Sequence, residues 1–430
     1  MKINRENLTR KNISFQSQKN STISNLINKD RMVDHFIKIA RIDTGSNPEL
    51  VGIKSPTTKG QIDLAQALST ELKELGLENV EIDAYGILTA TLPSNIDESP
   101  TVAFISHLDT SPDVKTSNVN PIIHNYTSGN IKLNDNQTIT EEELEEYKGH
   151  QIITSEGTTL LGADDKAGIS EIIEALRVFC ENPQLKRPTI KIAFTPDEEC
   201  GGGIEYFNIK KFNADVAYTV DGTTPETIDT ETFNAFNPTI IIKGVPTHCG
   251  YGYKKMLNSI DIASELIGML PKDESPSTTK DKEGYYHVDS ISGNVEETKI
   301  NMLVRDFDYD KAKERVKFIR TKIDELKKKY PEANFEMEAN EAYKNIKNYM
   351  SLNPKVIDNA KKGIQKSGLE VKENSVRGGT DGSFLTINGL LCPNIGAGGL
   401  NFHTQKEFIS AESMKKCCEN IINIAQSWVE

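Results

Sequence analysis

The sequence predicts an α/β protein in which a domain built on a mixed sheet is interrupted by an inserted ferredoxin-like domain. Short apolar strands alternate with amphipathic helices from residue 31 onward, and this alternation indicates a sheet covered on both faces. Between residues 236 and 345 the order becomes strand, helix, strand, strand, helix, strand, which is the ferredoxin-like order. The length of 430 residues suits two or three domains at about 150 residues each. We therefore expect residues 31–235 and 346–430 to form one domain and residues 236–345 to form the insert.

Residues 1–30 differ from the rest of the chain in composition. They are basic and rich in Asn, Ser and Thr, and they contain no compact apolar stretch. No secretory signal is visible, and the composition also permits an organellar transit peptide. We expect residues 1–30 to be a disordered N-terminal extension.

The main domain opens with two amphipathic helices. Apolar residues recur at helical spacing from Met32 to Ala40 and from Leu64 to Leu75, and Gly76 ends the second helix. Isoleucines and leucines at the same spacing predict a third helix from Lys166 to Cys180. The polar stretch from Pro112 to Asn136 is typical of a loop. Apolar or β-branched runs bounded by turn residues predict strands at Val80–Asp83, Ile87–Leu92, Thr101–Ser106, Gln151–Thr154, Thr189–Phe194 and Asp215–Val220.

The same two kinds of pattern, helical spacing and short apolar or alternating runs, predict the elements of the insert and of the segment after it. Alternating or apolar runs predict its strands, and helical spacing predicts its helices. The α/β pattern then returns with a helix at Pro354–Lys366 and continues to the end of the chain. The expected elements of the insert are strand Thr239–Lys243, helix Ser259–Leu270, strands Tyr286–Ile291 and Lys299–Arg305, helix Tyr309–Lys329 and strand Asn334–Ala339.

Charge and cysteine content exclude several classes of protein. The balance of 50 Lys and Arg against 63 Asp and Glu gives a net charge of -13, which opposes binding to a nucleic acid backbone. No apolar run approaches the roughly 18 residues of a transmembrane helix, so we expect no membrane partner. The six cysteines are sparse and show no CxxC spacing, which argues against a disulfide scaffold or a thiolate zinc site and favours the reducing cytoplasm.

Polar residues with metal-binding chemistry stand just past the carboxyl ends of the predicted strands, where open α/β sheets place their sites. Each residue alone has an ordinary explanation, such as a helix cap for Asp164 or a solvated carboxylate for Glu198 and Glu199. Five places share this position, and they are His107 and Asp109 in FISHLDTSPD, Asp164 and Asp165 in LLGADDKAG, Glu198 and Glu199 in AFTPDEECGGG, Asp221 in AYTVDG, and His403 in NIGAGGLNFHTQKEF.

Taken together, these residues point to a metal centre. Two imidazoles and three or more carboxylates form a nitrogen and oxygen ligand set that suits Zn²⁺, Co²⁺ or Mn²⁺. The carboxylates are too many for one metal, and their mutual repulsion would raise their pKa values and lower stability if no cation were present. The sequence therefore predicts a two-metal centre.

The longer motifs are similar to those of a known family. The blocks HLDTSPD, TLLGADDKAG, FTPDEE, YTVDG, RDFD, RGGTDG and NFH resemble the M20 family of di-zinc metallopeptidases, and RGGTDG with YTVDG favours its tripeptide aminopeptidase branch. The resemblance covers essentially everything after residue 30. It implies a di-zinc peptidase domain, a lid and dimerisation role for the insert, and two Zn²⁺ per subunit that Co²⁺ or Mn²⁺ can replace.

The resemblance also implies the metal ligands. His107 and Asp221 would bind one metal ion, and Glu199 and His403 would bind the other. Asp164 would bridge the two ions, with a cis peptide bond after it. The family places this bond there so that each carboxylate oxygen meets a different cation.

Two further carboxylates have roles implied by the resemblance. Asp109 would orient the imidazole of His107. Glu198 would be the general base that takes a proton from the metal-bridging water and returns it to the leaving amine. Proton transfer independently requires one carboxylate that is free of metal.

His248, in VPTHCGYGY, resembles the lid histidine of the family, which is thought to reach across a dimer into the partner's site. The family usually has proline after this histidine, whereas this chain has Cys249. Without the proline, the rigidity of this loop is in question. A surface histidine without a catalytic role is the alternative reading.

Two arginines are candidates for binding the carboxylate of the peptide, because a planar guanidinium suits bidentate capture. They are Arg377 in RGGTDG and Arg305 in RDFD. Arg305 could equally form a structural ion pair with Asp306 or Asp308.

These features predict a cytoplasmic, homodimeric aminopeptidase that releases the N-terminal residue from tripeptides. An M20 amidohydrolase or carboxypeptidase acting on N-acyl amino acids or dipeptides is the alternative enzyme. A non-catalytic binding protein is the alternative outside enzymes, and the intact base at Glu198 argues against it.

Overall fold

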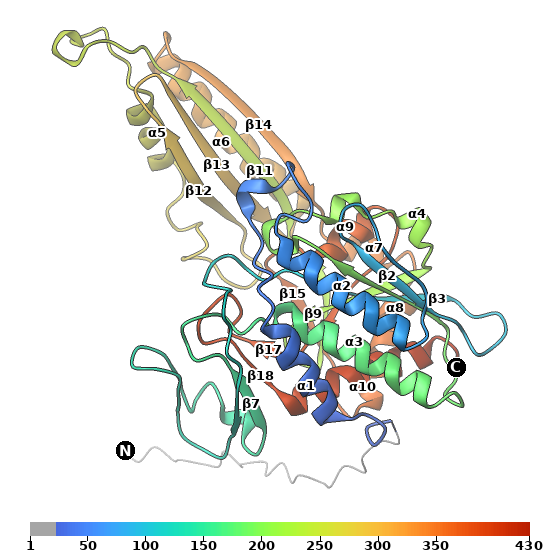
Figure 1. The fold of residues 1–430 in the computed structure, drawn as a ribbon. Helices are drawn as coiled ribbons and strands as arrows, with labels where there is room; N and C mark the ends of the chain where they lie inside the picture. The colour runs from blue at the N-terminus through green and yellow to red at the C-terminus, as the bar shows by residue number, and fades with distance from the viewer. Residues whose placement is uncertain (1–22) are drawn as a thin grey trace, which may run out of the picture.

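The computed structural model describes residues 23–430. Figure 1 shows a rounded body and an elongated arm, formed by residues 234–343, that projects from it. Residues 1–22 of the expected disordered extension lie outside the described residues. The expectation is wrong for residues 23–30, because Ile23 and Ile27 are buried in the main core and helix α1 (Lys29–Ala40) begins within this segment. The side chain of Asn28 caps α1 by accepting a hydrogen bond from the backbone N–H of Arg31.

The body is built on an eight-stranded mixed sheet, which confirms the predicted fold class. Strands β3, β8, β9 and β16 run parallel, and the outer strands include antiparallel pairs. In sheet order the strands are β1 (Glu78–Ile82), β2 (Leu88–Leu92), β8 (Thr189–Thr195), β3 (Thr101–His107), β9 (Val216–Gly222), β16 (Asn394–Gly396), β10 (Thr227–Thr232) and β15 (Lys372–Val376).

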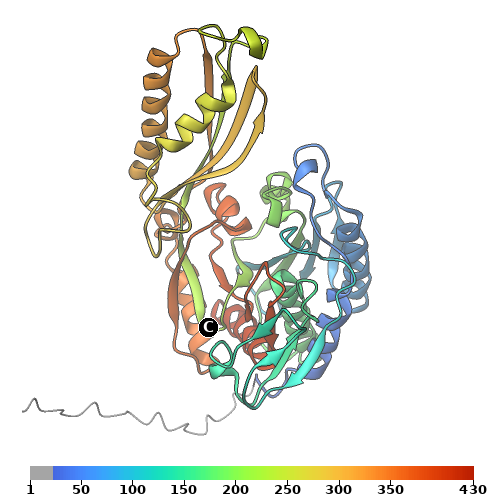
Figure 2. The ribbon, with the colours of Figure 1, turned by 90° about the vertical axis from the view of Figure 1, so that its left-hand side faces the viewer.

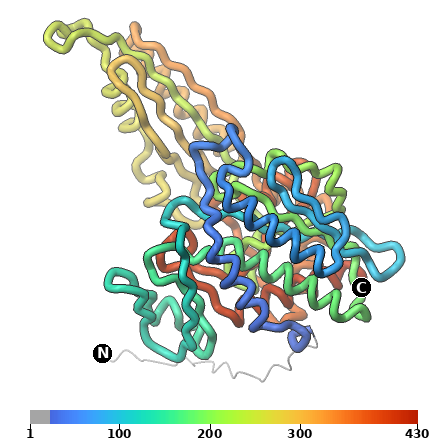
Figure 3. The backbone as a smooth tube through the Cα atoms, in the orientation of Figure 1, coloured from blue at the N-terminus to red at the C-terminus, as the bar shows by residue number. Residues whose placement is uncertain are grey.

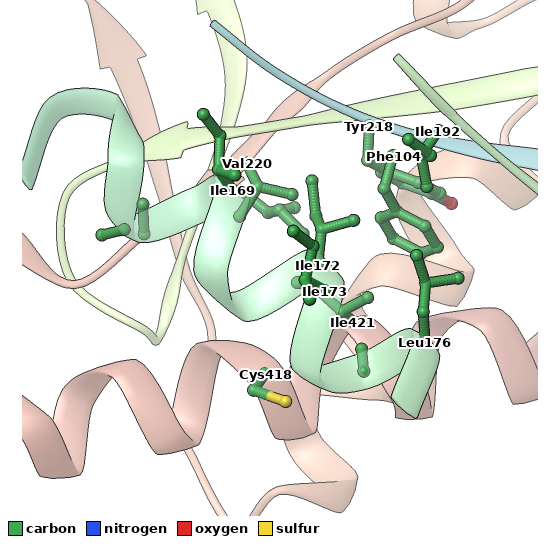
Figure 4. Packing of buried hydrophobic residues seen from close by; sticks show 14 of the residues in the cluster. Phe104, Ile169, Ile172, Ile173, Leu176, Ile192, Tyr218, Val220, Cys418 and Ile421 are labelled. Atoms are coloured by element: carbon green, nitrogen blue, oxygen red, sulfur yellow. The ribbon is translucent and has the colours of Figure 1, made fainter. Parts of the chain in front are cut away.

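Both faces of this sheet are buried. Val102 and Phe104 of β3 join the large core on one face, whereas Ala103 and Ile105 join a second cluster on the other face. This double burial explains why the central strands are continuous apolar runs in the sequence. Figure 4 shows side chains of the central strands and of two helices meeting in the large core. The helices of that face are α1, α2 (Lys59–Glu74), α3 (Ala163–Glu181), α8 (Lys355–Lys366) and α10 (Ala411–Ser427).

Helix α3 also buries an ionisable side chain that the metal centre does not use. Both carboxylate oxygens of Glu171 are buried and lack hydrogen-bond partners among the described residues. Burial raises the pKa of Glu171 well above its ordinary value. The folded chain therefore holds a proton that the unfolded chain releases above about pH 4.3, so this group lowers stability as pH rises from there toward its folded pKa.

We expect Glu171→Gln to raise the melting temperature more at pH 8 than at pH 5, because the penalty grows by about 1.4 kcal/mol for each pH unit between the two pKa values. Thermal unfolding at both pH values measures the effect. The matched control is Glu174→Gln, since Glu174 is also buried on α3 but pairs with Arg31. An equal effect of Glu171→Gln at both pH values would contradict the expectation.

The arm contains its elements in the order predicted from the sequence. They are β11 (Asn234–Lys243), α5 (Ser259–Gly268), β12 (Tyr285–Gly293), β13 (Glu297–Asp306), α6 (Tyr309–Lys329) and β14 (Asn334–Tyr343), and the sheet order is β12-β13-β11-β14. Both helices pack on one face of the sheet, as Figure 2 shows. Alternate residues such as Ile240 and Ile242 face this core. The boundaries at residues 236 and 345 and the lid and dimerisation role stay predictions.

The chain enters and leaves the arm through neighbouring strands. β11 pairs with β14, so the two crossings between body and arm lie side by side, as the trace in Figure 3 shows. Two buried asparagines join the crossings, because the backbone N–H of Asn345 donates to Asn234 and that of Thr232 donates to Asn345.

A small four-stranded sheet covers the edge of the body that carries the candidate site. Its order is β17-β18-β7-β4, from β17 (Gly399–Leu400), β18 (Phe408–Ser410), β7 (Gln151–Thr154) and β4 (Ile122–Asn125). The prediction of a loop at Pro112–Asn136 is therefore partly wrong, because it contains β4 and also β5 (Ile131–Lys132), which pairs with β6 (Thr138–Ile139). These strands are too short to show a period, and pairing with distant segments forms them.

Across residues 23–430, no helix combines the length and the apolar character needed to cross a membrane.

Candidate metal centre

The predicted metal ligands meet at one edge of the main sheet. His107 is the last residue of β3, Asp221 lies near the end of β9, and Glu198 and Glu199 begin the short helix η3 (Glu198–Cys200) after β8. These three strands are parallel and adjacent, so their carboxyl ends lie at the same edge. Asp164 arrives at the start of α3, and the loop between β17 and β18 brings His403.

Asp164 lies between the two imidazoles. Its Oδ1 is 2.9 Å from Nε2 of His107, and its Oδ2 is 3.5 Å from Nε2 of His403. Each carboxylate oxygen thus faces a different imidazole, which is the arrangement that a carboxylate shared by two metal ions requires. The peptide bond between Asp164 and Asp165 is cis, as the resemblance to the M20 family implied.

The remaining ligand candidates divide into two pairs. Oδ1 of Asp221 is 3.5 Å from Nε2 of His107, and Oε2 of Glu199 is 2.9 Å from Nε2 of His403. The other carboxylate oxygen of Glu199 is buried without a hydrogen-bond partner in the described chain. A buried oxygen of this kind is an available metal ligand.

Possible ligand atoms cluster in two overlapping groups. One group is His107, Asp164 and Glu199, the other is His107, Asp165 and Asp221, and the atoms within each lie at most 4.8 Å apart. Asp165 was not predicted as a ligand. It is fully buried, and its Oδ2 accepts a hydrogen bond from the backbone N–H of His107 at 3.2 Å. We therefore assign Asp165 to fixing the end of β3.

Two carboxylates and the two imidazoles of the cluster have raised pKa values, which means that the cluster favours added positive charge. Burial and the nearby charge of Asp164 raise the pKa of Glu199 to about 7 and that of Asp221 to about 7. Hydrogen bonds to Asp164 and Glu199 raise the pKa of His403 to about 11. Burial by itself lowers the pKa of His107, but its carboxylate neighbours raise it well above the ordinary value. Two divalent cations would supply the same positive charge, so the nitrogen and oxygen donors fit the predicted centre.

Asp109 connects His107 to the turn that carries the two glutamates. Its backbone carbonyl oxygen lies 3.0 Å from Nδ1 of His107, and its fully buried carboxylate lies 3.4 Å from the same nitrogen. The same carboxylate accepts hydrogen bonds from the backbone N–H groups of Glu198 at 2.9 Å and Glu199 at 3.1 Å. Asp109 also holds the turn after β8, which was not foreseen, and its orienting role toward the imidazole stays a prediction.

Glu198 lies beside the cluster with an unbound carboxylate. Its carboxylate accepts no hydrogen bond within residues 23–430, and burial followed by the charges of Asp221 and Asp381 raises its pKa well above the ordinary value. The turn before it is rigid because the carboxylate of Asp197 accepts hydrogen bonds from Thr57 N–H at 2.9 Å and Gln61 Nε2 at 2.7 Å. A carboxylate free of hydrogen bonds, held beside the ligand candidates on a fixed turn, suits a general base.

The chain does not bring His248 to the cluster. The segment that joins β11 to α5 lies at the far end of the arm from the body (Figures 1 and 2). His248 is exposed there, and its Nδ1 accepts a hydrogen bond from the backbone N–H of Gly250 at 3.2 Å. A catalytic role for His248 would have to be exerted on another subunit.

Arg377 is engaged with the arm. Its Nη1 donates to the carbonyl oxygens of Asp281 at 2.9 Å and Glu283 at 2.8 Å, and its Nη2 donates to Oγ1 of Thr279 at 2.8 Å. The guanidinium thus ties the end of β15 to the loop that precedes β12. Its role in substrate binding stays a prediction.

Arg305 is buried, and its Nη1 donates to the carbonyl oxygen of Phe236 at 3.0 Å and to Oδ1 of Asn237 at 3.0 Å. The alternative ion pair with Asp306 or Asp308 is wrong for the described chain. Asp306 pairs instead with an arginine of α6, and Asp308 caps that helix. Arg305 thus supports the base of the arm, and substrate binding by it stays a prediction.

Three polar residues around the site were not selected from the sequence. Nδ1 of His403 lies 3.1 Å from Oδ2 of Asp113 and 3.2 Å from Oγ of Ser111, so these two residues orient that ring. Asp381 is buried, accepts a hydrogen bond from Thr195, and has a pKa raised by burial to about 7. All three stand inside the motifs FISHLDTSPD and RGGTDG, and their place within those motifs was the available signal.

A mixed α/β sheet with this donor cluster at its carboxyl edge defines a metallopeptidase of the M20 type. The sequence pattern of the peptidase family M20/M25/M40 matches residues 140–427, and the chain belongs to this family. The resemblance seen in the motifs is thereby confirmed.

Within the family the chain is similar to peptidase T. It is 42% identical over 404 residues to peptidase T of Clostridium novyi (strain NT), and the alignment covers 92% of this chain and 99% of that protein. The fold is similar to the crystal structure of aminopeptidase PepT from Bacillus cereus, with a TM-score of 0.73, 23% identity and coverage of 94% of this chain and 100% of that one. A tripeptidase from Staphylococcus aureus matches with a TM-score of 0.74, 22% identity and the same coverage.

Proposed function

We propose that this chain is a metal-dependent aminopeptidase that releases the N-terminal residue from tripeptides. Family membership and the similarity to peptidase T over nearly the whole length support this function. The proposal rests most of all on Asp164, whose two oxygens face two imidazoles while the carboxylate of Glu198 stays unbound beside them.

We further propose that the cluster holds two Zn²⁺ per subunit, which Co²⁺ or Mn²⁺ can replace. His107 and Asp221 would bind one ion, Glu199 and His403 the other, and Asp164 both. When bound, the ions lower the pKa of a water molecule and offset the negative charge that develops on the carbonyl oxygen of the scissile bond.

Glu198 moves the proton. Its carboxylate takes a proton from the water oxygen that attacks the carbonyl carbon, and the same proton then passes to the amine nitrogen as the C–N bond breaks. Asp109 keeps this base at a constant position relative to His107, because one carboxylate binds both.

Hydrolysis of tri-Ala, di-Ala, tetra-Ala and N-acetyl-Ala tests the proposed function. We expect release of free N-terminal alanine mainly from tri-Ala, loss of activity with a chelator, and recovery with added Zn²⁺ or Co²⁺. Preference for N-acetyl-Ala or di-Ala would instead identify an M20 amidohydrolase or dipeptidase. Activity that survives complete removal of metal would overturn the proposal.

We also propose a homodimer formed through the arm. β12 is an edge strand of the arm's sheet, and its residues 289–293 are exposed. Exposed apolar side chains lie on β12 and on α5, at Ile291 and Ile260. A free strand edge with apolar neighbours is suited to pairing with a second copy. In such a dimer the loop that carries His248 would reach the partner's metal centre.

Complementation between inactive subunits tests this arrangement. A mixture of His248→Ala and Glu198→Gln proteins, after subunit exchange, should regain about one quarter of wild-type activity, since half of the dimers are mixed and each has one complete site. The control replaces the second protein with the double variant Glu198→Gln/His248→Ala, which should give no recovery. No recovery in the first mixture, after exchange is demonstrated, would contradict action in trans.

We propose a cytoplasmic location from the state of the cysteines. All six lie in the described part of the chain and are free, including the neighbouring buried pair Cys417 and Cys418. Free thiols persist in a reducing compartment.

A further inference from the structure

The loop between β17 and β18 carries a buried acidic residue, Glu407, in addition to the metal ligand candidate His403. Glu407 stands four residues after His403 and is only 1% exposed. Its Oε2 accepts hydrogen bonds from the backbone N–H groups of Leu161 at 2.7 Å and Gly162 at 2.8 Å, and its Oε1 accepts one from Asp164 at 3.0 Å. One carboxylate thus binds three backbone N–H groups within four residues of the segment that delivers Asp164.

This segment has no cap of its own. Gly162 precedes α3 with φ +84°, and no side chain in that position accepts a hydrogen bond from the helix. The N–H groups at the start of a helix lack intrahelical partners, so a buried start requires acceptors from elsewhere. Glu407 supplies them from a segment that lies 243 residues away from Asp164 in the sequence.

The same short loop therefore acts on both sides of the cluster. Through its imidazole, His403 faces Glu199 and Asp164, and through Glu407 the loop holds the backbone of Asp164. A movement of this loop would displace His403 and Asp164 together. Without the carboxylate of Glu407 this link would be lost and the two residues could shift independently, so the distance between Oδ2 of Asp164 and Nε2 of His403 depends on Glu407.

We propose that Glu407 is a positioning residue that sets the place of the shared carboxylate of Asp164 relative to His403. It thereby determines how tightly the metal ion held by Glu199 and His403, the second to bind, is bound. The inference rests on the proposed two-metal function. The carboxylate of Glu407 binds backbone N–H groups and acts through the backbone of Asp164. A purely structural cap would affect folding stability and leave metal binding unchanged.

Cobalt binding to the metal-free protein distinguishes these roles. Titration with Co²⁺ alone, followed by absorption spectroscopy, should show a smaller loss of affinity for the first equivalent than for the second in Glu407→Gln. The second equivalent should bind at least about 10-fold more weakly, in the range found when partners of metal ligands are removed. The visible spectrum of the doubly loaded protein should also change. Glu412→Gln is the matched control, because Glu412 also accepts a backbone N–H from a distant segment, that of Gln151, but lies outside the cluster.

A conservative variant keeps the inference testable if Glu407→Gln folds poorly. Glu407→Asp retains the charge and shortens the side chain, so partial recovery of the second affinity is expected. Wild-type affinity and spectrum for both equivalents in a folded Glu407→Gln or Glu407→Asp protein would overturn the inference. Metal binding is measured without peptide, so a failure here is distinguishable from a failure of tripeptide hydrolysis by the wild-type protein.

Discussion

Glu198→Gln is expected to keep its full metal content and to lose at least about 10²-fold in kcat, because general acid-base groups contribute roughly 10²–10⁴-fold. The glutamine side chain has nearly the same shape as glutamate but cannot accept the proton of the attacking water. Glu199 and Asp221 are unchanged, so the metal ligands stay in place. Steady-state hydrolysis of tri-Ala, together with metal analysis of the same sample, measures both quantities.

Glu205→Gln is the control for this substitution. Glu205 is exposed on the short helix η4 (Ile204–Tyr206), a few residues beyond the same turn. Its substitution by glutamine removes the same charge from a residue outside the cluster. It should leave kcat within a factor of about two, as surface changes usually have little effect. A fully metallated Glu198→Gln protein with near wild-type kcat would show that another group moves the proton.

Asp164→Ala is expected to bind neither metal ion tightly and to lose about 10³-fold or more in kcat/KM. Metal ions supply several kcal/mol of transition-state stabilisation, and each 1.36 kcal/mol is a factor of ten. The carboxylate of Asp164 faces both imidazoles, so its loss removes a ligand from each half of the cluster. Metal analysis after dialysis against dilute Zn²⁺ gives the stoichiometry.

His403→Ala provides the comparison. It removes a ligand from one half only, so about one equivalent of zinc should remain with His107 and Asp221. The two variants should therefore differ in the number of zinc ions that they retain. Two equivalents of zinc in Asp164→Ala would exclude the shared role, and equal zinc loss in both variants would contradict the division of the ligands.

Much of the fold could be predicted because its elements have local signals. The strand Gln151–Thr154 and the helix Tyr309–Lys329 have the predicted bounds, and most others differ by a few residues. The central strands are recognisable because both faces are buried, and α6 because apolar residues recur every three to four positions. β4 and β5 carried no such signal, since they are short and exist only by pairing with other segments.

Many residues of the candidate site could be predicted, but not all of their contacts. Residues at the carboxyl ends of parallel strands converge by a general rule, which made His107, Glu199 and Asp221 candidates, and the resemblance to the M20 family implied their roles as ligands. The partners of arginines follow no such rule. Arg377 binds backbone carbonyl oxygens of the arm, and Arg305 binds groups of the neighbouring strand, where the sequence alone suggested substrate or an ion pair.

By itself the sequence determined the class of fold, the order of elements in the arm and the chemistry of the donors. These depend on periodicity, strand ends and residue type, which are local properties of the chain. Only the tertiary structure decided which oxygen of Asp164 faces which imidazole, that Asp109 holds the turn of Glu198, and that Glu407 binds the segment before α3. These contacts join segments dozens to hundreds of residues apart, and their geometry is set by the packing of the whole sheet and its helices, which no local pattern records.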